Sequence, residues 1–143
     1  MVARRYLVPL LDLLILFAWS FAAATILPLS SEVPLVFAVR RSGGWMVPVV
    51  VATAGNYLGA CTTYLLARYV TDRAKPVPSR RTAHASALIA RYGPPALLLS
   101  WVPLIGDVLV VLAGIAHIPF VRFSIWTLIG KAARYVAVGW VVN

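Results

Sequence analysis

The chain has 143 residues, of which 62% are hydrophobic and 12% are charged. Soluble domains contain about half apolar and about a quarter charged residues, so this composition excludes an ordinary soluble domain and predicts an integral membrane protein. The net charge of +9 is explained by anionic lipid headgroups and by the preference of Lys and Arg for cytoplasmic loops, so we expect no nucleic-acid partner. The single cysteine, Cys61, cannot form an internal disulfide, a metal cluster or a redox pair, and we expect no cofactor or metal.

Residues Met1 to Arg5 form a short basic start, and an apolar run from Tyr6 to Leu27 follows it. This beginning imitates a secretory signal peptide. The run is longer than the hydrophobic region of about 7 to 15 residues that such peptides carry. We therefore expect it to remain in the protein as the first membrane-inserted helix.

The stretch from Thr25 to Val39, TILPLSSEVPLVFAV, interrupts the apolar sequence with prolines, hydroxyls and the carboxylate of Glu32. Proline lacks the backbone N–H and clashes with the preceding turn, so no continuous helix is expected. The apolar arm from Val33 to Val39 would be about 10 Å long, whereas the hydrocarbon core is about 30 Å thick. The sequence predicts a re-entrant helix whose irregular tip is covered by protein or by a water-filled cavity. Besides Glu32, the expected tip residues are Pro28, Ser30, Ser31 and Pro34.

Trp45 to Ala67 is long enough for a complete transmembrane helix. Gly55 and Gly59 form a GxxxG motif in it, which favours close packing between helices and is compatible with a homodimer. Asn56, beside the first glycine, is one of the few polar side chains of this helix.

The segment from Arg68 to Arg91 is hydrophilic and basic, with Pro76 and Pro78 in its middle. We expect it to be a linker whose residues after Pro78 form a short helix on the anionic membrane surface. The preference of basic loops for the cytoplasm predicts that this linker is cytoplasmic.

The broken stretch recurs 75 residues later, where Ser100 to Gly114, SWVPLIGDVLVVLAG, aligns with Thr25 to Val39 without a gap. A chance match between two apolar segments is the alternative. The rare residues keep their spacing, however, which favours an internal repeat with a second break at Pro103 and Gly106. The aligned prolines are Pro28 and Pro103, and the aligned carboxylates are Glu32 and Asp107.

The last predicted helix, Phe123 to Val142, contains Lys131 and Arg134, which share one face because they are three residues apart. The repeat places Lys131 opposite Asn56. Cations at this depth are costly and seldom face lipid, so we expect both to point inward. Their partner is either an anionic ligand or, in a structural salt bridge, Glu32 or Asp107, and the two interpretations are compatible.

Together these features predict an all-α integral membrane protein built as an inverted repeat of two re-entrant helical hairpins, each followed by a transmembrane helix. Residues 1–143 form a single membrane domain, with repeat one at about 6–67, the basic linker at 68–91 and repeat two at about 92–143. Inverted-repeat membrane proteins bind substrates and ions near the membrane midplane, at their broken helices. The predicted substrate and proton site consists of Glu32, Asp107, Lys131, Arg134 and Asn56.

The strings LPLSSEVPLV, GNYLGACTTYLLAR, RYGPPALLLSWVPLIGDVLVVLAGIAHIPF and IGKAARY resemble the DedA superfamily of SNARE-associated or VTT-domain proteins, most closely its short YqaA-like branch. The resemblance extends from about Phe21 to Tyr135. It implies a bacterial inner-membrane protein with two facing re-entrant hairpins that moves phospholipids or a polyprenyl-phosphate carrier between leaflets with proton dependence. The family's acidic tip residue corresponds to Glu32, and its helix motif corresponds to Gly55, Gly59, Tyr64 and Arg68, with Ala67 where glycine is usual.

The chain departs from this family at the second tip. Typical members carry two arginines there, in a string like RFIPGVR, whereas this chain reads WVPLIGD, with Trp101 and Asp107. This change removes an obvious phosphate clamp. We hypothesise that Lys131 and Arg134 supply the missing cations.

The predicted function is transport or scrambling of an anionic lipid headgroup through a polar cleft, with Glu32 and Asp107 exchanging a proton when the headgroup leaves. Two alternatives belong to other classes: a small multidrug or ion exporter, and a membrane structural or assembly factor that transports nothing. We do not expect an enzyme, because the sequence has no nucleophile elbow, HExxH motif, P-loop or magnesium-binding aspartate cluster.

Overall fold

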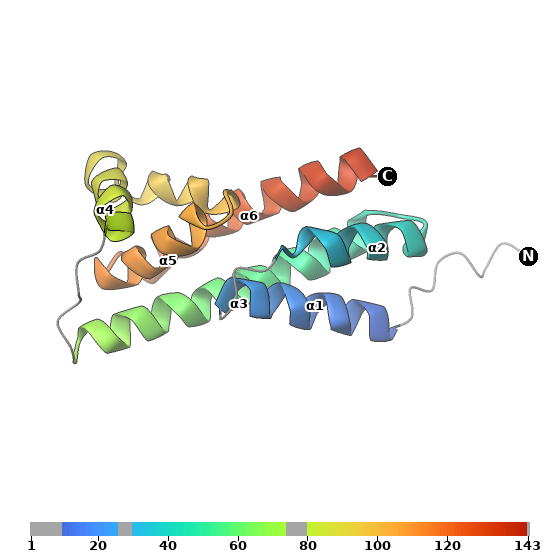
Figure 1. Ribbon diagram of the computed structural model, residues 1–143, viewed down its shortest axis with the longest axis horizontal. Helices are drawn as coiled ribbons and strands as arrows, with labels where there is room; N and C mark the ends of the chain where they lie inside the picture. Colours follow the sequence, from blue (N-terminus) through green and yellow to red (C-terminus); the bar gives the residue numbers. More distant parts are fainter. Residues whose placement is uncertain (1–9, 26–29, 74–79, 143) are drawn as a thin grey trace, which may run out of the picture. The chain divides into compact units, whose positions relative to one another are not determined.

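The computed structural model describes residues 10–25, 30–73 and 80–142, so the predicted tip residue Pro28 lies outside the described residues. All of the regular structure in these ranges is helical, as the sequence predicts (Figure 1). The elements are α1 (Leu10–Thr25), α2 (Glu32–Ser42), α3 (Met46–Thr71), α4 (Arg80–Tyr92), the 3₁₀ helix η2 (Pro94–Trp101), α5 (Ile105–Ile115) and α6 (Phe120–Val142).

Two of the described helices are long and apolar enough to cross a membrane: α3 with 26 residues and α6 with 23. At about 1.5 Å per residue they extend about 39 Å and about 35 Å, which exceeds the hydrocarbon thickness of about 30 Å. The helices α1 and α5 are apolar but shorter. The helix α2 has 11 residues and is about 16 Å long, too short to cross, as expected for the arm after the first break.

The predicted linker at 68–91 is largely helical where the structure describes it. The helix α3 continues past Ala67 to Thr71, and α4 occupies Arg80–Tyr92. Of the helices after the first break, α4 is the most polar and amphipathic, in keeping with the short surface helix that the sequence predicts after Pro78.

The chain divides into two compact units, which we describe separately. The first consists of Met1–Gly59 and Ala132–Asn143, and the second of Ala60–Lys131, so that α3 and α6 contribute residues to both.

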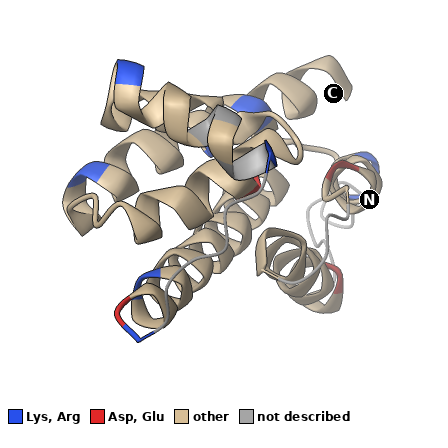
Figure 2. Cartoon of the chain, turned by 60° about the vertical axis from the view of Figure 1, so that its left-hand side comes forward, with Lys and Arg blue, Asp and Glu red and all other residues tan. Residues whose placement is uncertain are grey.

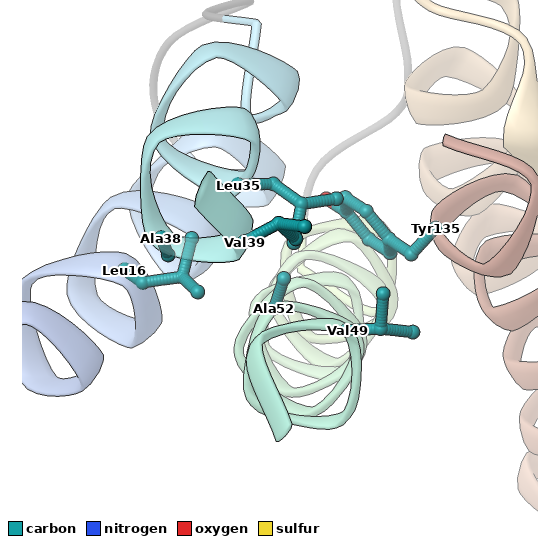
Figure 3. Close-up of a cluster of buried hydrophobic side chains, with 7 residues drawn as sticks. All are labelled: Leu16, Leu35, Ala38, Val39, Val49, Ala52 and Tyr135. Atoms are coloured by element: carbon teal, nitrogen blue, oxygen red, sulfur yellow. The ribbon is translucent and has the colours of Figure 1, made fainter. Parts of the chain in front are cut away.

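In the first unit, α1 and α2 pack as an antiparallel hairpin. The Nη1 atom of Arg41, near the end of α2, lies 3.2 Å from Oδ2 of Asp12, near the start of α1. At the other end of the hairpin, Nε1 of Trp19 donates a hydrogen bond to the carbonyl of Ser30. The core of this unit contains side chains from α1, α2, α3 and α6 (Figure 3): Leu16, Leu35, Ala38, Val39, Val49, Ala52 and Tyr135.

The GxxxG motif packs α3 against α1 within the same chain. A Cβ atom on Gly55 would lie 2.6 Å from the carbonyl oxygen of Phe17, and one on Gly59 would lie 2.5 Å from that of Phe21. Only glycine allows the two backbones to approach this closely. The motif is used for this contact within the chain, so it is no longer an argument for a homodimer. The homodimer remains a prediction.

In the second unit, α4, η2 and α5 pack together. The second repeat, predicted to begin at about residue 92 and to break at Pro103 and Gly106, starts with a 3₁₀ helix at Pro94, and a tight turn follows. Two consecutive prolines without N–H groups explain why an α-helix does not continue there. In the turn Leu104 has φ 67° and ψ −52°, and the N–H of Ile105 donates to the carbonyl of Pro103 at 2.8 Å. This is a γ-turn of the rare kind with positive φ.

Candidate functional site

Charged side chains are sparse on these helices, and Figure 2 shows that most of each ribbon carries none. One charge pair lies at the start of α2, where the sequence predicts the first tip. The guanidinium of Arg134, in α6, donates from Nη2 at 2.7 Å and from Nε at 3.0 Å to Oε1 of Glu32. The side chain of Arg134 is 14% exposed and that of Glu32 is 41% exposed. The structural salt bridge between Arg134 and Glu32, one of the two interpretations that the sequence leaves open, is therefore present.

The N-terminal end of α2 is a favourable position for the carboxylate of Glu32. Glu32 is in the first turn of the helix, where a negative charge interacts favourably with the helix dipole. Ser31 occupies the N-cap position but makes no side-chain capping bond. Its hydroxyl instead shares a hydrogen bond with the hydroxyl of Tyr135, in the residue that follows Arg134.

Buried polar side chains surround this point of the first unit. We call Ser20, Ser31, Asn56 and Tyr135 the tip cluster; each of them is at most 5% exposed. Nδ2 of Asn56 donates to the carbonyl of Ser20 at 3.1 Å, which ties α3 to α1. Burying polar groups is costly unless they are hydrogen-bonded, so a polar cluster in so apolar a protein is a candidate for a functional site.

The five residues of the predicted site are divided between the two units. Glu32, Arg134 and Asn56 belong to the first unit, and Asp107 and Lys131 to the second. Lys131 is 3% exposed, which agrees with the expectation that it avoids lipid, and Asp107 is half-buried in the first turn of α5. That all five act in one site remains a prediction.

The second tip lies in the second unit. Pro103 is the residue before the γ-turn centre, and Gly106 is buried against the backbone of Ser100, with no room for a Cβ atom between them. The hydroxyl of Ser100 donates to the carbonyl of Thr127 in α6 at 3.4 Å. In the first unit, Ser30 precedes α2 and Pro34 is in its first turn.

Within the described residues, no three His, Cys, Asp or Glu side chains gather as they would around a metal ion. The charge pair and the hydroxyl and amide groups of the tip cluster suit a polar or anionic ligand group.

Comparison with known proteins assigns the family. The profile of the VTT domain matches residues 27–142. The chain belongs to the VTT-domain family. It is 44% identical over 131 residues to the inner membrane protein YqaA of Escherichia coli (strain K12), covering 90% of this chain and 89% of that protein. It is 38% identical over 134 residues to an uncharacterized protein of Haemophilus influenzae, covering 88% and 84%. No solved structure matches the chain.

These matches confirm the resemblance to the YqaA-like branch of the DedA superfamily and make the chain a bacterial inner-membrane protein. In that setting α3 and α6 are the candidate membrane spans among the described helices. The coverage of both chains shows that the likeness extends over nearly the whole protein.

The residues of α3 that the resemblance likens to a family motif have a visible structural role. Nη1 of Arg68 donates to the hydroxyl of Tyr64 at 3.0 Å, and that hydroxyl donates to the carbonyl of Ile118, in the connection between α5 and α6. The ring of Tyr64 stacks on Phe123 with centroids 4.3 Å apart. Arg68 thus helps to hold this connection against α3.

The structure also explains how alanine is accepted at position 67. Gly114 of α5 packs against this part of α3, and a Cβ atom there would lie 2.9 Å from Cβ of Ala67. The glycine that this close approach needs is therefore on α5 in this chain. Ala67 contributes a methyl group to this contact, and Gly114 contributes none.

Sequence reasoning missed two partners in these networks. Tyr135 was not predicted as a site residue, although it directly follows Arg134, and its hydroxyl shares a hydrogen bond with Ser31. His117 was missed as well: Nε2 lies 2.8 Å from Oδ1 of Asp72 and Nδ1 lies 2.9 Å from the carbonyl oxygen of Ile115. The hydrogen bond to Asp72, followed by that to Ile115, raises the pKa of His117 above its ordinary value of 6.5. No local pattern pairs residues 45 positions apart.

Proposed function

We propose that this protein moves the phosphate headgroup of an anionic lipid, a phospholipid or a polyprenyl phosphate, between the leaflets of the inner membrane. The observation that carries the proposal is the ion pair between Glu32 and Arg134 beside the buried tip cluster. Membership in the VTT-domain family supports a membrane transporter over an enzyme.

Arg134 has the chemistry that this function needs. A guanidinium binds phosphate through two parallel charge-assisted hydrogen bonds and remains charged at any physiological pH. The two bonds from Nη2 and Nε to Glu32 support this role, because this edge of the guanidinium already pairs with a carboxylate. Glu32 occupies the position that a lipid phosphate would take.

The proposed cycle is an exchange of anions at Arg134. A buried cation left without a partner is strongly unfavourable, so Arg134 is paired with Glu32 until a phosphate replaces that carboxylate. The phosphate displaces the Glu32 carboxylate, which is the more exposed partner of the pair. When the phosphate leaves, Glu32 pairs with Arg134 again, so the guanidinium alternates between two anions.

The second repeat contributes by analogy of sequence. Asp107 corresponds to Glu32, and Lys131 adds a buried cation on the same helix face as Arg134. The order of elements supports the repeat, since a short helix follows each break and a long helix follows each short one. We therefore infer an inverted repeat of two re-entrant hairpins, with Asp107 as the counterpart of Glu32 and Lys131 as a second buried cation of α6.

The test is leaflet exchange of fluorescent phospholipids and of a polyprenyl phosphate in liposomes that contain the purified protein. We expect the wild type to catalyse exchange and Glu32→Gln and Arg134→Gln to abolish it. Arg122→Gln is the matched control, because Arg122 is exposed at the start of α6, and it should exchange lipid like the wild type.

Circular dichroism and gel filtration of each variant establish whether it is folded. A wild type that exchanges neither lipid would refute the proposal, and binding of cationic drugs would then favour a small exporter. If the wild type transports nothing and the variants are less stable than the wild type, an assembly factor is favoured.

A further inference from the structure

The first unit contains a second feature in which charge and apolar surface meet, away from the Glu32–Arg134 pair. A groove of about 140 Å³ lies between α1 and α2. Five apolar side chains line it: Ile15, Leu16, Pro34, Phe37 and Ala38. The ion pair of Asp12 and Arg41 completes the lining, toward the start of α1 and the end of α2.

The groove has a buried floor and exposed rims. Leu16 and Ala38 are buried and form its floor, and Figure 3 shows them meeting between α1 and α2. Ile15 and Phe37 form the rims and are 52% and 65% exposed. The short side chain of Ala38 leaves the space between them.

The charged end of the groove presents a cation to its surroundings. Oδ2 of Asp12 is buried and lies 3.2 Å from Nη1 of Arg41, whereas the Arg41 side chain is 67% exposed. Arg40, its neighbour in the last turn of α2, is exposed as well. Two guanidinium groups and one carboxylate give this end a net charge of +1, with the positive groups outermost.

We propose that this groove binds an anionic glycerophospholipid, with part of one acyl chain between α1 and α2 and the phosphate on Arg41 and Arg40. The volume of the groove is close to that of an apolar cavity of about 150 Å³ that accommodates benzene, so a short stretch of one chain fits. An acyl chain gains little by leaving the bilayer for an equally apolar groove. The headgroup therefore decides which lipid binds, and an anionic one complements the net positive end.

This site is distinct from the proposed transport site, and its occupant need not be transported. Phosphatidylethanolamine would bring an ammonium group to a surface whose outermost groups are already cations, so we expect phosphatidylglycerol to bind in preference. The Asp12 side chain is 21% exposed and pairs with Arg41, which limits how far this carboxylate compensates the ammonium.

Native mass spectrometry of the full chain in detergent, titrated with phosphatidylglycerol or phosphatidylethanolamine of matched chains, tests the proposal. We expect Arg41→Gln to weaken phosphatidylglycerol binding by about fivefold or more, as loss of a charge-assisted hydrogen bond would. Asp12→Asn breaks the same ion pair but keeps the guanidinium, and it should bind phosphatidylglycerol at least as tightly as the wild type. This pair of variants separates loss of the ligand contact from loss of the ion pair.

Two further pairs define the site. Ile15→Trp fills the groove and should reduce lipid retention, whereas Leu14→Trp, at an equally exposed position outside the lining, should not. Arg122→Gln, which removes an exposed cation outside the groove, should bind phosphatidylglycerol like the wild type. Leaflet exchange by Arg41→Gln should equal that of the wild type, which keeps this result independent of the transport test. Equal binding of the two lipids by the wild type, or equal losses with Arg41→Gln and Arg122→Gln, would overturn the proposal.

Discussion

Arg134 donates two hydrogen bonds to a single oxygen of Glu32, and the two side chains come from positions 102 residues apart. The arginine is the more buried partner, at 14% exposed against 41% for the carboxylate. Removing the carboxylate therefore leaves the more buried charge, that of Arg134, without its partner, and an unpaired charge costs more the more it is buried. Removing the arginine leaves a carboxylate that water can partly solvate.

We accordingly expect Glu32→Gln to lower the free energy of unfolding more than Arg134→Gln does. The double variant should recover part of the loss, with a coupling energy of about 1 kcal/mol for a pair that is neither fully buried nor fully exposed. Unfolding of the three variants in mixed micelles measures this cycle. Strictly additive effects would show that the ion pair contributes nothing to the fold.

His117 is the second informative residue, because both of its ring nitrogens face acceptors. A neutral imidazole has one N–H and satisfies only one acceptor, whereas the imidazolium satisfies the carboxylate of Asp72 and the carbonyl of Ile115 together. The raised pKa of His117 has this cause, and the nearby charge of Arg68 opposes it.

This contact predicts a pH dependence with a definite sign. The folded state binds the proton more tightly than the unfolded state, so the stabilisation is fully present below pH 6.5 and is lost as pH rises through the raised pKa of His117. The melting temperature of the wild type should exceed that of His117→Gln at pH 5.5, and the difference should shrink by pH 8.5. A difference that grows with pH would contradict the prediction.

At the scale of elements, close helix packing depends on a few glycines. The contact of α3 with α1 places backbone carbonyls against Gly55 and Gly59. A backbone atom cannot move aside as the end of a flexible side chain does. The two helices must therefore separate to admit even one methyl group.

Gly59→Ala should destabilise the protein by about 1–3 kcal/mol, the range for overpacking a tight contact. Gly44→Ala is the matched control, because no atom lies within 4 Å of the added Cβ, and it should leave stability within about 0.5 kcal/mol of the wild type. Thermal unfolding in detergent compares the two. Equal melting temperatures would mean that the helix contact relaxes freely.

The turn after η2 stores backbone strain at Leu104, whose φ is 67° and whose side chain is 58% exposed. Glycine adopts positive φ without steric cost, and little packing is lost at this exposed position. Leu104→Gly should therefore be neutral or stabilise by up to about 1 kcal/mol, whereas Leu99→Gly within η2 should destabilise by about 0.5–1 kcal/mol. Chemical unfolding of both variants decides whether the turn is strained.

At the scale of the whole molecule, the proposed inverted repeat predicts the sidedness of the two hairpins. The connections after the short helices, at Gly44 and Ala116, should face opposite sides of the inner membrane. Both positions are exposed, and the native Cys61 is buried. Gly44→Cys and Ala116→Cys are tested with a membrane-impermeant thiol reagent. Only one of the two should react on whole cells, and the other should react only after the inner membrane is made permeable. Labelling of both from one side would exclude the inverted arrangement.

Much of this architecture could be predicted from the sequence, because it depends on local chemistry. Apolar runs of sufficient length predict α3 and α6, and prolines without N–H groups predict the interruptions around Ser30 and Pro103. The strings around both breaks and in α3 also indicated the family that the comparisons confirm. The 3₁₀ form of η2 was missed, since Pro94 and Pro95 exclude an α-helix without specifying what replaces it.

The sequence alone determined that this is a helical membrane protein of the VTT-domain family, because composition, helix length and helix-breaking residues act over a few neighbouring positions. Only the tertiary structure decided which polar groups meet: Arg134 with Glu32, Tyr135 with Ser31, Arg41 with Asp12 and His117 with Asp72. Helical periodicity predicts which residues share a face of one helix. The partner of a buried charge is chosen by the packing of helices that lie far apart in the chain, and no local pattern contains that information.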